Sequence, residues 1–121
     1  MPVSLSTTSI PHATRLKRRA EFLRVAAKGR KVALPGLVLQ VLARADTAPV
    51  RLGFTVTRRV GNAVVRNRTR RRLKEAARLL LAQRKLTGAD LVLIGREATR
   101  ARPFPDLQED LRRALARGGL A

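Results

Sequence analysis

The sequence predicts a small α+β domain, a two-layer α/β sandwich with elements in the order helix, strand, strand, helix, strand, helix. The chain has 121 residues, of which 45% are hydrophobic, enough for one domain with a modest core. Three stretches place apolar residues at the three- and four-residue steps of a helix, and three shorter stretches alternate or run apolar over the length of a strand. We expect helices on one face of the sheet and an available opposite face.

Residues 1–14 are rich in Ser, Thr and Pro and show no hydrophobic period, so we expect a flexible N-terminal arm. The first helix is predicted over 15–28, capped by Thr14 and ended by Gly29. Its core stripe consists of residues spaced three or four apart, with two further residues beside it: Leu16, Ala20, Leu23 and Ala27, then Phe22 and Ala26.

Two strands are predicted next, over residues 34–44 and 50–57, joined by a turn. The second alternates cleanly, which is typical of a half-buried antiparallel strand. Its Gly53 leaves the polar face flat, which suits close approach by a backbone or a ligand. Residues 90–95 form a short apolar run typical of a central strand covered on both faces.

A long helix is predicted from the N-cap Asn62 to about residue 84. Its narrow apolar stripe is formed by Val65, Thr69, Leu73, Ala76 and Leu80. The last helix covers 105–117, with acids in its first turns and arginines toward its end, and Gly118 is its C-cap. We expect one domain over 15–117 and a tail over 118–121.

The formal net charge is +19, and the segment from Arg58 to Lys74 contains eight basic residues and no acid. Like charges four residues apart on a helix repel by about 0.2–0.5 kcal/mol per pair, and a polyanion lying along the helix would relieve this repulsion. A solvated helix face would mix both signs of charge. The pattern therefore favours a phosphate-bearing partner, either nucleic acid or an anionic membrane surface, and the predominance of Arg favours nucleic acid.

The chemistry of catalysis has few candidates here. Cysteines are absent, the one histidine is His12 in the expected arm, and the eight acids form no spaced cluster of the kind that holds two metal ions. No apolar run approaches the ~18 residues of a membrane span, and no secretory signal is evident, so we expect a cytoplasmic protein that does not bind membranes.

Residues 51–78 closely resemble the signature of the bacterial ribonuclease P protein family, whose hallmark triplet is here Arg66-Asn67-Arg68, preceded by Gly61-Asn62. The resemblance covers roughly residues 15–115. It implies a ribonucleoprotein in which a large RNA is the catalyst and removes the 5′ leader of precursor tRNA. Mg²⁺ would be held chiefly by the RNA subunit and the substrate, with no protein metal site and no obligate protein partner. It also implies a left-handed β–α–β crossover, where general rules favour a right-handed one.

The resemblance assigns two sets of residues. The RNA subunit would be bound by Arg58, Arg59, Asn62, Arg66, Asn67, Arg68, Arg70, Arg71 and Lys74. A cleft between the first helix and the sheet would receive the leader, lined by Phe22, Ala26, Gln40, Arg51 and Thr55. Ala26 and Gln40 stand where the family commonly has aromatic residues, so Phe22 is the one expected stacking platform, and leader binding should depend mainly on charge.

Three other protein classes share parts of this pattern. A basic ribosomal protein could have the same small fold, but the Arg66-Asn67-Arg68 triplet with its Gly61-Asn62 lead-in argues against it. A protein nuclease would need a carboxylate cluster. A DNA-architectural protein is compatible with the charge alone.

Overall fold

The computed structural model describes residues 10–120. All six predicted elements are present, together with short ones that the sequence pattern did not reveal. In chain order they are β1 (Ala13–Arg15), α2 (Arg19–Lys28), β2 (Arg30–Ala33), β3 (Leu37–Ala43), β4 (Val50–Val56), the 3-10 turn η1 (Arg58–Val60), α3 (Ala63–Gln83), β5 (Ala89–Gly95), α4 (Glu97–Ala101) and α5 (Phe104–Arg117).

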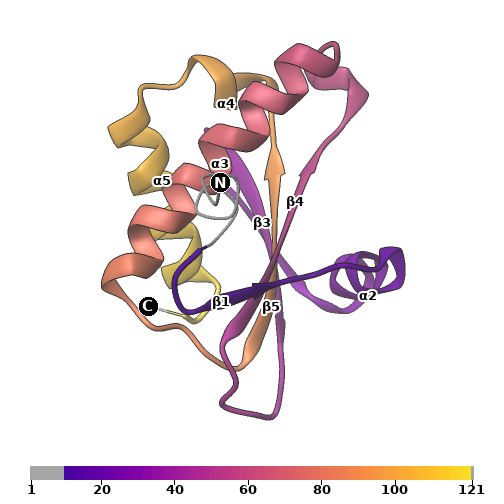
Figure 1. Cartoon of the computed structure of the whole chain (residues 1–121), viewed down its shortest axis with the longest axis vertical. Coiled ribbons are helices and arrows are strands. Elements are labelled where there is room, and N and C mark those ends of the chain that lie inside the picture. The colour runs from indigo at the N-terminus through magenta and orange to yellow at the C-terminus, as the bar shows by residue number, and fades with distance from the viewer. Residues whose placement is uncertain (1–9, 121) are drawn as a thin grey trace, which may run out of the picture.

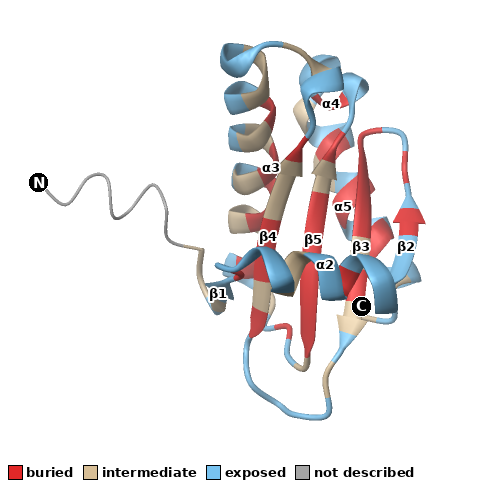
Figure 2. Ribbon diagram, turned by 90° about the vertical axis from the view of Figure 1, so that its right-hand side faces the viewer, coloured by how far each residue is buried: buried red, intermediate tan, exposed pale blue. Residues whose placement is uncertain are grey.

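Figure 1 shows the sheet nearly edge-on, with α3 and α5 on one side and α2 on the other. The sheet has five strands in the order β1-β4-β5-β3-β2 (Figure 2). β4 pairs parallel with both β1 and β5, so the antiparallel pairing expected from its alternation was wrong. β3 pairs antiparallel with β5 and with β2. The apolar run in β5 is accordingly central and covered on both faces, as its composition predicted.

The connection from β4 through α3 to β5 has the unusual hand that the family resemblance implies. In Figure 2, α2 lies in front of the sheet, β4 and β5 run upward, and β5 lies to the right of β4. α3 packs with α5 on the far face of the sheet. A crossover that passes behind the sheet while moving to the right is left-handed, against the general preference.

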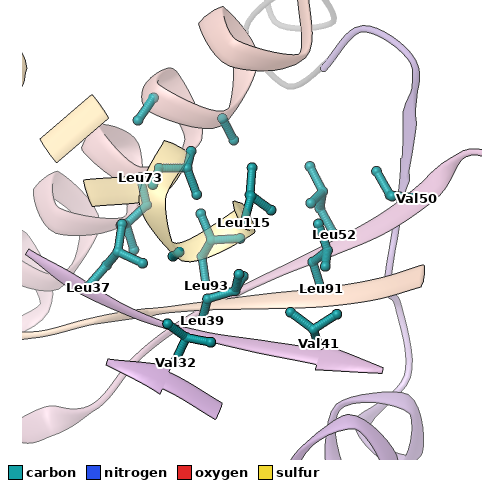
Figure 3. Close-up of a cluster of buried hydrophobic side chains, with 14 of the residues drawn as sticks. Val32, Leu37, Leu39, Val41, Val50, Leu52, Leu73, Leu91, Leu93 and Leu115 are labelled. Carbon is teal, nitrogen blue, oxygen red and sulfur yellow. The ribbon is translucent and has the colours of Figure 1, made fainter. Parts of the chain in front are cut away.

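The main core lies between the sheet and the helices α3 and α5 (Figure 3). Side chains from alternate positions of β3, β4 and β5 meet the apolar stripe of α3 there, with Leu39, Leu93 and Leu73 fully buried. The predicted stripe of α3 is confirmed, with Thr69, Leu73 and Ala76 buried. Its apolar stripe faces the core, so the helix turns its basic side chains outward.

α2 lies alone on the opposite face of the sheet, where Leu16, Val25 and Val92 form a second, small cluster. The predicted stripe of this helix was wrong. Leu23 is 54% exposed, and the side chains that meet the sheet are Val25 and the half-buried Phe22. The stripe was displaced because its helix was taken to begin four residues too early.

Residues 13–15 are a strand, so Thr14 does not cap a helix. Ala13–Arg15 pairs with β4, and the next amide, of Leu16, donates to the carbonyl of Leu52 at 2.9 Å. This pairing holds the backbone extended up to the helix start at Arg19. The expected flexible arm lies outside the described residues for 1–9, and its last residues, Ala13 and Thr14, belong to β1.

Candidate nucleic-acid interface

The turn between β4 and α3 fixes the start of the basic helix. Gly61 has φ 152°, a conformation that favours glycine, and a β-carbon there would lie 2.9 Å from Cγ1 of Val65. The side chain of Asn62 accepts a hydrogen bond from the amide of Val65 at 3.0 Å, so it is the predicted N-cap. Arg66 donates from Nη1 to the carbonyl of Gly61 at 2.9 Å and closes the corner.

The three residues of the Arg66-Asn67-Arg68 triplet differ in their surroundings. Arg66 is half-buried by its contact with Gly61, whereas Asn67 and Arg68 are exposed. Asn67 accepts a hydrogen bond from Arg70 at 3.0 Å. Arg68 forms no hydrogen bond or ion pair through its side chain within residues 10–120, so its guanidinium can bind a phosphate without losing another partner.

The remaining cations of α3 divide into available and engaged groups. Arg72 turns inward, donates to the carbonyl of Arg102 and lies 5.7 Å from the ring centre of Phe104. Arg78 is paired with Glu75. Arg58, Arg59 and Arg71 are exposed and have no side-chain partner among the described residues, and they surround the same end of the helix as Arg68.

Lys74 lies among other positive charges on the flank of α3 that faces β4. Its ammonium lies 5.9 Å from the ring centre of Phe54. Partial burial lowers the pKa of Lys74, and the positive charges of Arg15 and Arg70 lower that pKa further. An anion bound on this flank would counter the repulsion from these neighbours. Such an anion would therefore raise the pKa of Lys74 toward its ordinary value.

α2 crosses the sheet over one row of residues and leaves the next row open. Gln40, Val92 and Gly53 are paired across β3, β5 and β4 and lie beneath the helix. A β-carbon on Gly53 would lie 2.3 Å from Cε2 of Phe22, so the ring of Phe22 packs directly on this glycine. Gly53 permits the close approach that its position predicted, but the approaching group is a side chain of the protein itself.

The next row toward the carboxyl ends of β4 and β5 is Val38, Ile94 and Thr55. Val38 is buried, whereas Thr55 and Ile94 are half-buried. Figure 2 shows α2 crossing the sheet below the upper ends of β4 and β5. Glu21 lies on the side of α2 that faces Arg51, away from this open row. Helical spacing places Ala26, Leu23 and Arg19 on the other side of α2, toward the open row. This row and that flank of α2 form the candidate cleft.

Arg51 lies on the other side of α2 and is engaged by two carboxylates. Its guanidinium makes a bidentate contact with Asp90, at 2.8 Å from Nε to Oδ1 and 2.6 Å from Nη2 to Oδ2. Its Nη1 lies 2.7 Å from Oε2 of Glu21. The hydrogen bonds that Arg51 donates to Asp90 raise the pKa of Arg51. Arg51 thus ties α2 to the sheet and does not line the open cleft, contrary to its predicted place.

Asp90 is the centre of this ion-pair network. Burial alone would raise its pKa, but the hydrogen bonds from Arg51 and Arg44 outweigh burial and hold the pKa of Asp90 below its ordinary value. Arg44 donates to Asp90 at 2.7 Å and also pairs with Asp46. Glu21 accepts the amides of Lys17 and Arg18 at 2.8 and 2.9 Å, which caps α2 from within.

Comparison with known proteins identifies the family. The model of the family described as Ribonuclease P matches residues 10–119. The chain belongs to the ribonuclease P protein family. It is 63% identical over 108 residues to the ribonuclease P protein component of Gluconacetobacter diazotrophicus, covering 89% of this chain and 93% of that protein. It is 50% identical to that of Paramagnetospirillum magneticum, covering 87% of this chain and 82% of the relative.

Solved structures of ribonuclease P proteins have the same fold. The protein from Staphylococcus aureus has a TM-score of 0.74 at 26% identity and covers 88% of this chain and 95% of its own. That from Thermotoga maritima has a TM-score of 0.72 at 28% identity, covering 85% of this chain and 96% of its own. The left-handed crossover and the sheet order described above are therefore features of a ribonuclease P protein fold.

The predicted cleft residues of this ribonuclease P family member do not all lie together. Phe22, Ala26 and Thr55 border the open row, Gln40 lies partly under α2, and Arg51 lies beyond it. The sequence analysis missed Leu23 and Arg19, because the helix register was set by the wrong start. Glu21, placed three residues after Arg18, was the signal that would have corrected it.

Two further findings concern metal ions and membrane spans. Within residues 10–120, no group of three or more His, Cys, Asp or Glu side chains is arranged to hold a metal ion. No helix in this part of the chain is long and apolar enough to cross a membrane.

Proposed function

We propose that this ribonuclease P protein binds the RNA subunit through the β4–α3 corner and the 5′ leader of precursor tRNA through the cleft beside α2. The RNA performs the hydrolysis that removes the leader, in the cytoplasm. The observation that carries the proposal is the set of exposed, unpaired arginines around the Arg66-Asn67-Arg68 triplet in a chain of this family. They offer guanidinium forks to RNA phosphates.

The β4–α3 corner is built to keep these arginines in position. Gly61 and Asn62 fix the entry into α3, and Arg66 closes the corner on the Gly61 carbonyl. Arg68 and Arg71 then project from a helix that is packed on the core along its other side. A rigid helix loses little conformational freedom on binding, so more of the contact energy appears as affinity.

The cleft supports binding of a single RNA strand with limited stacking. Its floor at Ile94 and Thr55 is uncharged, and Phe22 has its ring packed against Gly53, which leaves less of the ring free for a base. The wall on α2 carries Arg19 and the exposed Leu23. Charge is therefore the main source of leader affinity, with Phe22 and Leu23 contributing apolar contact.

The proposal assigns the Mg²⁺ ions to the RNA and the substrate. Of the eight carboxylates in the chain, six pair with arginine: Glu21, Asp46, Glu75, Asp90, Glu109 and Asp110. A carboxylate paired with Arg is a poor ligand for a hard cation, which needs several free oxygen donors. The residues present thus do not fit a protein-held Mg²⁺ site.

The test is reconstitution with the RNA subunit and precursor tRNA at limiting Mg²⁺. We expect 5′-leader removal by the RNA to be stimulated by this protein, and no cleavage by the protein alone. Specific leader removal without the RNA would contradict the binding-subunit role. Failure to bind or stimulate the RNA would instead favour a ribosomal-type RNA-binding role.

A further inference from the structure

A second group of cations lies at the edge of the sheet farthest from the arginines of the triplet. It consists of Lys28 at the end of α2, Arg30 and Lys31 on β2, and Arg113 and Arg117 on α5. All five are exposed, and none forms an ion pair with a carboxylate within residues 10–120. We call these five residues the β2-edge cations.

Strand register and helix packing bring these residues together. Arg30 pairs with Val41, and a β-carbon on Gly118, next to Arg117, would lie 2.9 Å from Cγ2 of Val41. Arg30 also shares a face of β2 with Val32, which is buried in the core beneath α5. The side chains of Arg30 and Arg117 therefore extend from neighbouring points on one surface.

Arg113 lies on the same side of α5 as Arg117, one helical turn away. That side faces the β2–β3 connection, because Asp110 on it accepts the amide of Gly36 at 2.9 Å. The carboxylate of Asp110 is also engaged by Arg102. The other flank of α5 faces α3, where Phe104 meets Arg72. The positive charge of Arg113 and Arg117 is thus directed to the β2 edge.

The β2-edge cations are separated from the triplet by the width of the sheet. α3 contacts β4, and β2 is three strand spacings from β4, about 14 Å at ordinary strand separation. Among the described residues, β2 is an edge strand with no further strand beyond it (Figure 2). An open edge strand lined with Lys and Arg is protected from pairing with another strand, and it also presents a row of cations to a polyanion.

We propose that the β2-edge cations bind the phosphate backbone of a second RNA segment, distinct from the segment held by α3. This inference rests on the proposed RNA-binding function. The protein would then lie between two RNA segments and hold them at a fixed separation. The segment belongs to the RNA subunit, because the proposed leader cleft lies beside α2, on the face of the sheet opposite to α5 with its Arg113 and Arg117.

The test uses the full-length variant Arg30→Gln/Arg117→Gln. Its matched control is Lys85→Gln/Arg112→Gln, which removes the same formal charge from the loop after α3 and from the other flank of α5. In the first arm, affinity for the RNA subunit is measured as a function of salt. In the second arm, affinity of the assembled holoenzyme for precursor and mature tRNA is measured in the same way.

Loss of two phosphate contacts should lower the slope of log affinity against log salt by about 1.4 to 1.8. Affinity would then vary about tenfold less between about 50 and about 200 mM salt than it does for the unaltered protein. A change in the first arm supports binding of the RNA subunit, and a change confined to the second arm would overturn that assignment in favour of precursor tRNA. In chemical cleavage of the RNA backbone, the Arg30→Gln/Arg117→Gln variant should lose protection of one RNA segment only.

Slopes equal to those of the control variant in both arms would overturn the inference. Arg68→Gln/Arg71→Gln, tested alongside, separates this failure from failure of the proposed function. If the triplet variant loses affinity and the β2-edge variant does not, the protein binds RNA through α3 alone. If neither variant changes RNA binding, the proposed function is wrong as well.

Discussion

The ring of Phe22 lies on the backbone of Gly53, with Cε2 only 2.3 Å from the position that a β-carbon of residue 53 would occupy. This contact docks α2 on the face of the sheet opposite to the main core. The main structural role of Phe22 is thus to pack α2 on the sheet, which leaves less of its ring free to stack on a base. The contact explains why a glycine occurs in the middle of β4, where it otherwise weakens a strand.

Gly53→Ala should lower the free energy of unfolding by about 1–3 kcal/mol, because Phe22 must shift to admit the new methyl group. Denaturant unfolding measures the change. In the Phe22→Leu background the same substitution should cost clearly less, since the smaller side chain leaves room. Equal costs in both backgrounds would show that Phe22 does not pack on Gly53.

Asp90→Asn should destabilise the protein by about 1.5–3 kcal/mol, because it removes charge-assisted hydrogen bonds to Arg51 and Arg44. The loss should appear in unfolding experiments and as increased hydrogen exchange in α2, which Arg51 holds through Glu21. Asp106→Asn, at an exposed acid in the first turn of α5, is the control. It should cost at most the ~0.3–1 kcal/mol of a helix-dipole interaction and leave hydrogen exchange in α2 unchanged.

Acid should weaken the fold through the same network. The pKa of folded Asp90 lies below its ordinary value of 3.8. Its ionised form therefore stabilises the fold above that value, and the contribution is lost as the pH falls through the folded-state pKa. The free energy of unfolding should be steady from neutral pH to about pH 5 and fall below about pH 4. Asp90→Asn should show a shallower fall, and a parallel profile would exclude Asp90 as a cause.

The two arginines of the triplet should differ when replaced. Arg68→Ala should weaken binding to the RNA subunit about tenfold or more and leave unfolding unchanged, because its side chain is exposed and unpaired. Arg66→Ala should also cost about 0.5–1.5 kcal/mol of stability, since Arg66 closes the corner on Gly61. Arg68→Lys should restore charge but not the bidentate geometry, so partial recovery is expected. Equal stability losses in the two Ala variants would contradict this division.

Discrimination between precursor and mature tRNA should weaken steeply as salt rises at fixed Mg²⁺, because leader binding depends mainly on charge. Phe22→Ala should lower the preference by at most one stacking increment, about 1–3 kcal/mol, and leave the salt slope unchanged. Leu23→Ala, at the exposed position beside it, should lower the preference without lowering stability. A preference that is independent of salt and abolished in Phe22→Ala would mean that stacking holds the leader.

The basic corner was predictable because its signals are local. The cap at Asn62, the glycine before it and the apolar stripe of α3 lie within one helix and the turn that precedes it, and the structure confirms each. The cleft was less predictable. Its geometry depends on where α2 begins, and that start is set by pairing of Ala13–Arg15 with β4, far away in the chain.

The sequence by itself determined the α+β composition, the face of α3 that enters the core and the excess of positive charge along that helix, because periodicity and charge act along neighbouring residues. Only the tertiary structure decided which cations are available. Nothing in the local sequence distinguishes Arg51 and Arg72 from Arg68. In the structure, however, Arg51 pairs with Asp90 and Glu21. Arg72 contacts the ring of Phe104 and donates to the Arg102 carbonyl. Those partners lie 30 or more positions away along the chain. Only folding brings such groups into contact, and the spacing of a single helix or strand carries no record of them.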